Sequence, residues 1–215
     1  QHIAGQDMAI DEGILPGETE ECLRFEPLLT DIAASFVNLP ANQIDASITA
    51  AQERVCEYLG IDRCVLWQFT AQGSGKIWIS HVHDASNGFL PDAPFDADKT
   101  FPWIFERIQH CKNVIIERLD DLPQEARVDR ESMRQWGVKS TFVIPMLLEG
   151  KILGALSFGS LSRETMWNEN LVKRLHLVAQ LFSNALSHKL AEERLIARRR
   201  FESLVADISA RFVNF

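Results

Sequence analysis

Two kinds of hydrophobic spacing alternate along this chain, and they predict a protein that mixes helices and strands. Apolar side chains recur every three or four residues over 25–38, 41–59 and 168–190, which is the spacing of an amphipathic helix. Shorter apolar runs at 63–70 and 139–148 indicate buried strands instead.

Two pairs of apolar segments predict β-hairpins. Segments 63–70 and 76–83 are separated by a turn that contains glycine and serine, and segments 139–148 and 151–160 are separated by Glu149-Gly150. Between the hairpins the sequence predicts, in order, a long loop, a helix, a short strand, a turn and another helix, over 84–100, 101–110, 113–116, 119–123 and 124–136.

The second predicted strand carries a pair of histidines. Strict alternation would place Ile77, Ile79, His81 and His83 on one face of this strand. Two histidines on one face can ligate a metal ion or occupy an axial position of a haem. The sequence offers no obvious third ligand, and the alternative is a strand with a polar, partly exposed face. We therefore predict no metal site.

The chain also repeats one of its own segments. The sequence FEPLLTDIAASFVN at 25–38 and the sequence FESLVADISARFVN at 201–214 are identical at nine of fourteen positions. Shared amphipathic character alone would not preserve matched polar residues such as Asp31 and Asp207. The repeat therefore predicts the first helix of a second copy of one structural unit.

This repeat divides the chain into three predicted parts. Residues 1–23 form a linker, residues 24–190 form one domain, and residues 191–215 continue a signalling helix into a second, truncated repeat. The apolar spacing of 168–190 carries on into the last part, which predicts one continuous helix that can pair as a coiled coil. Because the chain starts at Gln1 and ends inside a repeat, we expect it to be cut from a longer protein.

Composition narrows the possible classes of function. Thirty acidic residues against 22 basic ones give a net charge of −8, which argues against a protein that binds nucleic acid. No apolar run reaches the roughly 20 residues that a membrane helix needs, and the N-terminus lacks a signal-peptide pattern. Four cysteines without a CxxC pair favour a reducing, cytoplasmic location.

The clearest motif lies in the second hairpin. Segment 137–160 contains a glycine, a short strand that ends near a proline, a glycine turn and a strand that contains a glycine, at Gly137, Pro145, Gly150 and Gly154. In this order of features the chain resembles the GAF domain. The preceding segment, 118–137, resembles the GAF subgroup found, often in tandem, in bacterial sensor histidine kinases.

The resemblance implies both a fold and a function. The implied fold is α+β, with a central antiparallel sheet, the terminal helices on one face and a pocket on the other face, covered by the middle helices and the long loop. The implied function is sensory or regulatory: the domain binds an unknown small molecule, forms a homodimer through its terminal helices and passes a signal along the C-terminal helix. It implies no catalytic residue in this chain and names no cofactor.

Aromatic side chains dominate the expected pocket, and such side chains suit a planar or apolar ligand. The ligand-pocket candidates are Trp67, Phe69, His81, His83, Phe101, Trp103, Trp136 and Phe142. Aromatic residues also dominate ordinary cores. A spacer domain that only dimerises and transmits a signal therefore stays open as an alternative.

Two further alternatives follow from other members of the family that the chain resembles. Phytochrome-type GAF domains attach a bilin to a cysteine, typically next to a histidine, but here the order is His110-Cys111, which does not favour attachment. GAF-fold free methionine sulfoxide reductases act through clustered cysteines, whereas Cys56 and Cys64 fall on different predicted elements. A thiol redox enzyme is thus the less favoured alternative.

Overall fold

A six-stranded antiparallel sheet forms the centre of the protein. The computed structural model describes residues 16–70, 75–86, 88–148 and 150–213, and the strand order of its sheet is β3-β2-β1-β6-β5-β4. The strands are β1 (Arg63–Phe69), β2 (Lys76–Asp84), β3 (Phe95–Asp96), β4 (Val114–Ile116), β5 (Ser140–Leu148) and β6 (Lys151–Ser160). Both predicted hairpins are present, as β1–β2 and β5–β6.

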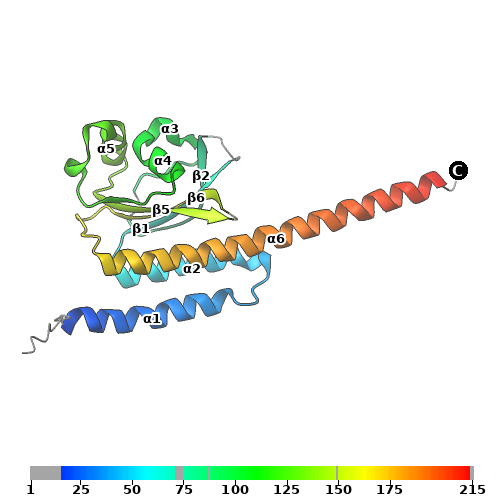
Figure 1. Ribbon diagram of the computed structural model, residues 1–215, viewed down its shortest axis with the longest axis horizontal. Coiled ribbons are helices and arrows are strands. Elements are labelled where there is room, and N and C mark those ends of the chain that lie inside the picture. Colours follow the sequence, from blue (N-terminus) through cyan, green and yellow to red (C-terminus); the bar gives the residue numbers. More distant parts are fainter. Residues whose placement is uncertain (1–15, 71–74, 87, 149, 214–215) are drawn as a thin grey trace, which may run out of the picture.

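Helices cover both faces of this sheet, so the α+β fold class is confirmed. The α-helices are α1 (Pro16–Phe36), α2 (Ala41–Leu59), α3 (Ala97–Thr100), α4 (Pro102–Gln109), α5 (Arg127–Gln135) and α6 (Glu169–Val213), and 3-10 turns occupy Leu119–Asp121 and Gln124–Ala126. Figure 1 shows α2 and α6 beneath the sheet, α1 packed below them, and α3, α4 and α5 on the opposite face.

The main core lies between the sheet and the long helices. From the helices it receives the fully buried side chains of Ile48 in α2 and Phe182 in α6. From the sheet it receives Leu66, Phe142 and Phe158. Burying such side chains contributes about 1.5–3 kcal/mol each, so this interface holds the terminal helices against the sheet.

Two segments that the sequence predicted as irregular contain helix or strand in the structure. Helix α1 begins at Pro16, inside the segment 1–23 predicted as a linker, and residues 1–15 of that segment lie outside the described residues. The predicted loop 84–100 ends in strand β3 and helix α3. These elements contain two and four residues, too few for a periodic hydrophobic pattern.

A β-bulge in β2 changes which side chains share a face. Leu66 of β1 pairs with His81, but the next residue, Trp67, pairs with Ile79, so Ser80 is the extra residue. A bulge inserts one residue and moves the following side chains to the other face. The prediction that Ile79 and His81 share a face is therefore wrong.

On the helix side of the sheet, His81 joins a polar cluster that connects three elements. Its Nε2 lies 3.0 Å from Oδ1 of Asp45 in α2, and the same carboxylate accepts hydrogen bonds of 2.6 and 2.7 Å from Lys189 of α6. Burial lowers the pKa of His81 below its usual value, although Asp45 opposes this shift. The neutral form of His81 is therefore favoured in the folded protein.

This shift predicts a pH dependence of stability. Because the pKa of His81 is lower in the folded protein than its unperturbed value of 6.5, the unfolded chain takes up the proton first as the pH falls. Stability contributed by neutral His81 is then lost as the pH falls through 6.5. Denaturant unfolding between about pH 5 and about pH 7.5 should show a smaller loss for His81→Gln than for the wild type. Equal losses in the two proteins would contradict the assignment of this pH dependence to His81. The partly buried His176 is present in both proteins, so it cannot cause a difference between them.

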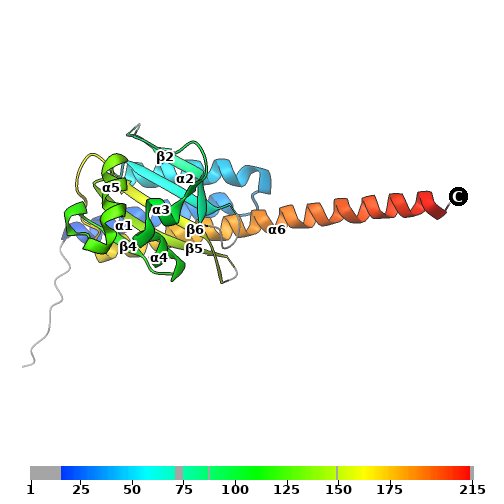
Figure 2. The same ribbon diagram turned by 90° about the horizontal axis from the view of Figure 1, so that it is seen from above.

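Helix α6 continues well beyond the domain. It spans 45 residues, and both views show it leaving the sheet as one rod (Figure 1, Figure 2). The continuous helix that the apolar spacing predicts is thus observed, from Glu169 to Val213. In the first copy of the repeat Phe25 is 1% exposed, whereas its counterpart Phe201 is 67% exposed. The second copy therefore presents an apolar face without a partner in the described chain.

Hydropathy adds one further observation. Within the described ranges, none of the helices combines the length and the apolar character that a membrane-spanning segment requires.

Candidate ligand-binding site

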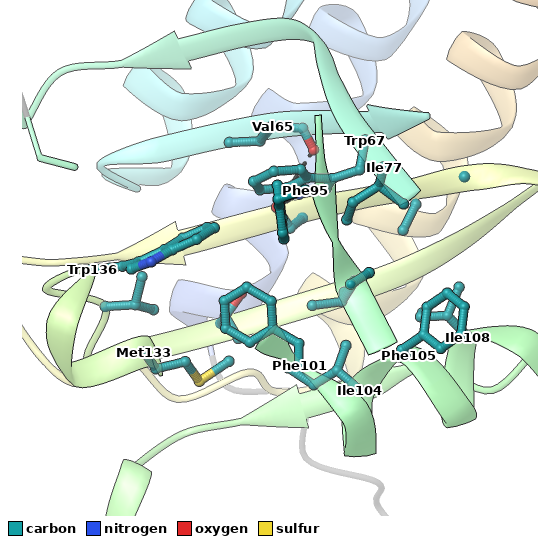
Figure 3. A pocket seen from close by; sticks show the side chains of 18 of the residues that line it. Val65, Trp67, Ile77, Phe95, Phe101, Ile104, Phe105, Ile108, Met133 and Trp136 are labelled. Carbon is teal, nitrogen blue, oxygen red and sulfur yellow. Dashed lines mark hydrogen bonds between the residues drawn. The ribbon is translucent and has the colours of Figure 1, made fainter. Parts of the chain in front are cut away.

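A cavity lies between the sheet and the helices α3, α4 and α5. Its volume is about 110 Å³. Figure 3 shows sheet side chains such as Trp67 and Ile77 on one side of this space, with Phe101, Ile104 and Phe105 of the helical layer on the other. A concave, mostly apolar site of this kind is typical of small-molecule binding.

Strand alternation builds the floor of the cavity. Val65 and Trp67 of β1, Val143 of β5 and Ala155 and Ser157 of β6 all line it. The residues between them, including Leu66 and Leu156, point to the helices on the other face and are fully buried there. The same three strands thus form a wall shared by the cavity and the terminal helices.

Asp129 fixes the helical cover of the cavity. This buried residue of α5 accepts hydrogen bonds from the backbone N–H groups of Trp103 and Ile104, at 3.1 and 3.0 Å, at the start of α4. Burial raises the pKa of Asp129, although these two N–H groups oppose the shift. Because the carboxylate satisfies free N–H groups of another helix, it holds α4 against α5.

Trp136, at the end of α5, is the centre of an aromatic cluster in the cavity wall. Its ring centroid lies 4.8 Å from Phe101, 5.5 Å from both Phe89 and Phe95, and 6.1 Å from Trp67. Most of these contacts are edge-to-face, which is the favoured geometry for aromatic pairs. The rings of this cluster fill part of the space between the sheet and the helices, and the cavity is the part that they leave open.

Polar groups in the wall are few, and most have partners within the protein. The indole N–H of Trp67 donates to Oγ of Ser157 at 2.8 Å, and Thr141 donates to the carbonyl of Phe158 at 3.0 Å. Arg63 is 4% exposed and donates to Asp84 at 2.8 Å. Burial alone would raise the pKa of Asp84, but hydrogen bonds from Ser86 and Arg63 hold it below its usual value.

The structure brings together half of the pocket candidates predicted from the sequence. Four of them line the cavity, namely Trp67, Phe69, Phe101 and Trp136. The other four, His81, His83, Trp103 and Phe142, are not among the residues that line it. Whether a ligand contacts the first four stays a prediction.

Each of the four others has a physical reason for its place. The bulge at Ser80 turns His81 toward Asp45 and places His83 opposite Cys64, on the helix side. Trp103 lines a separate hollow beside β4, and the guanidinium of Arg107 lies 3.8 Å from its ring centroid.

Phe142 pairs with Phe158 and is fully buried in the core under α6. Its ring lies 6.0 Å from Trp167 and 5.7 Å from His176 on that side. The side chain therefore faces the terminal helices rather than the cavity.

Sequence reasoning missed several cavity residues. Among them are Arg63, Val65, Met133, Val143 and Ser157. A charged residue at the start of an otherwise apolar strand was a usable signal for Arg63, because a buried charge needs partners. The aliphatic residues gave no such signal, since both faces of their strands are apolar.

None of the three cysteines whose side chains the structure describes lines the cavity. Cys56 and Cys64 are buried against each other on the helix side, where burial and the neighbouring Cys56 thiol raise the pKa of Cys64. Cys111 is exposed after α4. Nor do the described residues contain a group of three or more side chains placed to hold a metal ion.

Comparison with known proteins identifies the family. The GAF domain family matches residues 43–186, which is more than half of the chain, so the chain belongs to the GAF domain family. None of the curated proteins matches it.

Solved structures share the fold at low sequence identity. The phycocyanobilin-bound GAF domain of a cyanobacterial phytochrome has 21% identity and a TM-score of 0.64, covering 78% of this chain and 96% of that one. The GAF domain of a phosphoenolpyruvate-protein phosphotransferase from Coxiella burnetii has 15% identity and a TM-score of 0.63, covering 80% and 98%. The free methionine-R-sulfoxide reductase from Neisseria meningitidis, in complex with its substrate, has 12% identity and a TM-score of 0.61, covering 89% and 97%.

Proposed function

We propose that this chain is a sensory GAF domain that binds a small molecule in its cavity and transmits the binding event to α6. The observation that carries the proposal is the shared wall. Val143 and Ser157 line the cavity, while their neighbours Phe142 and Phe158 pack under the terminal helices. A ligand that moves β5 or β6 thereby changes the surface on which α6 lies, provided that its affinity differs between two packing states.

We further propose that the output is the activity of a bacterial sensor histidine kinase and that this chain has no catalytic role of its own. The resemblance of segment 118–137 supports the kinase context. The raised pKa of Cys64 speaks against thiol chemistry at the buried pair, because the thiolate is the reactive form. The free, buried thiols of Cys56 and Cys64 support the cytoplasmic location that we propose.

We also propose that the chain forms a homodimer through its terminal helices. Support comes from the apolar side chains Phe201, Leu204, Val205 and Ile208, all exposed on the far part of α6. Their spacing of one, three or four residues places them along one side of a helix, as in a coiled-coil seam.

Native mass spectrometry tests the ligand and the dimer together. We expect the freshly purified chain to appear as a dimer with additional bound mass, and Leu204→Glu to appear as a monomer. Arg199→Glu is a matched control on an exposed position of the same helix and should stay dimeric. A monomer at all concentrations would contradict the dimer proposal.

If no bound mass is found, benzene serves as a probe of the empty chain. We expect it to shift NMR signals of cavity residues and to lose affinity in Ala155→Leu, which fills the floor. An empty dimer that does not respond to benzene would contradict ligand binding. The spacer alternative, which the aromatic cluster around Trp136 favours, would then be the better account.

A further inference from the structure

We propose that the cavity selects a neutral, single-ring aromatic compound with one hydrogen-bond acceptor, such as an aryl ketone. In this arrangement the Nε–H group of Arg63 donates to the acceptor. The inference rests on the proposed ligand-binding function and names the chemical class of its ligand.

The size of the cavity limits the ligand to about one ring. An apolar cavity of about 150 Å³ binds benzene, and a single water needs about 10–15 Å³. The cavity here has a volume of about 110 Å³. A compound with several fused or linked rings would require the aromatic cluster around Trp136 to move.

The requirement for an acceptor follows from Arg63. Its terminal nitrogens donate to the carbonyl of Phe89 at 3.2 Å and to Asp84 at 2.8 Å. Its Nε is buried and has no hydrogen-bond partner among the described residues. A second buried atom without a partner, Oε1 of Gln52, belongs to a residue that does not line the cavity. A ligand that supplies an acceptor to Nε would remove the cost of this unpaired donor.

The requirement for a neutral ligand follows from Asp84. Its carboxylate already pairs with Arg63, and the two side chains are 11% and 4% exposed. An anionic ligand would have to give up its hydration in an apolar cavity while lying close to this second negative charge. A neutral carbonyl needs only the one N–H group.

Binding of two probes of similar size, acetophenone and ethylbenzene, tests the proposal. Arg63→Lys is the matched variant, because lysine has a methylene group where arginine has Nε and keeps the positive charge beside Asp84. We expect this variant to weaken acetophenone binding about tenfold and to change ethylbenzene binding less than about twofold. Arg163→Lys, at an exposed position, should leave both affinities unchanged.

The outcomes separate this inference from the proposed function. If Arg63→Lys weakens both probes equally, the acceptor contact is wrong while ligand binding stands. If benzoate binds the wild type more tightly than acetophenone does, the preference for a neutral ligand is wrong. If none of the three probes binds the wild type, the inference is overturned, while the ligand-binding function is decided separately by bound mass and by the response to benzene.

An NMR measurement on the wild type tests the proposal without any substitution. The Nε–H signal of Arg63 in an NMR spectrum should shift with acetophenone and stay in place with ethylbenzene. Identical shifts for both probes would overturn the inference even if Arg63→Lys did not fold.

Discussion

We expect Gly154→Ala to lower the free energy of unfolding by about 3 kcal/mol or more, or to prevent folding. A Cβ atom at this position of β6 would lie 1.8 Å from the carbonyl oxygen of Trp67 in the adjacent strand β1. This oxygen belongs to the backbone, so relief requires the two central strands to separate. Chemical denaturation monitored by circular dichroism measures the effect.

Gly159→Ala on the same strand is the matched control. A Cβ atom there would meet Arg63 and Leu161 side-chain atoms at 3.9 Å, which is ordinary contact. We expect its stability to stay within about 1 kcal/mol of the wild type. Comparable losses in both variants would show that alanine is disfavoured in this strand for a reason other than close backbone approach.

Phe142→Ala should be the second large effect, at about 3–5 kcal/mol of lost stability. Phe142 is fully buried between β5 and the terminal helices, beside Trp167 and His176. Truncation leaves a void in the core that holds α6 to the sheet. The same substitution should leave the cavity on the other face unchanged, which an NMR titration with benzene can measure.

Val143→Ala, one residue further along, should cost less stability than Phe142→Ala but change ligand binding in the cavity. It removes two methyl groups from the cavity floor, so we expect a stability loss of about 2 kcal/mol and a changed affinity for benzene. If Phe142→Ala changes benzene binding more than Val143→Ala does, the assignment of these two residues to opposite faces is wrong.

Long, regular elements were predictable from the sequence because their periodicity extends over many residues. Helix α6 and the hairpins β1–β2 and β5–β6 belong to this group. It was harder to predict on which face of the sheet each individual residue lies. A single inserted residue, Ser80, reverses the faces of His81 and His83, and alternation alone cannot show where such a bulge lies.

Strand β5 illustrates a second limit. Its sequence is apolar on both faces, because one face packs against helices and the other lines a cavity, so nothing in the pattern distinguishes Phe142 from Val143. The sequence therefore predicted that the candidate site is aromatic, but it identified only some of the residues that line it. Arg63 could have been noticed as a charge in an apolar strand, but only the folded structure identifies its partners Asp84 and Phe89.

The unbroken course of α6 makes the orientation of its far end depend on residue count. Each residue turns an α-helix by about 100° and lengthens it by about 1.5 Å. Adding one residue between the buried Phe182 and the exposed Phe201 would rotate the apolar face of the second repeat by about a quarter turn relative to the sheet. Adding seven residues would nearly restore the angle while moving that face about 10 Å further away. The number of residues in this segment thus fixes an angle as well as a length.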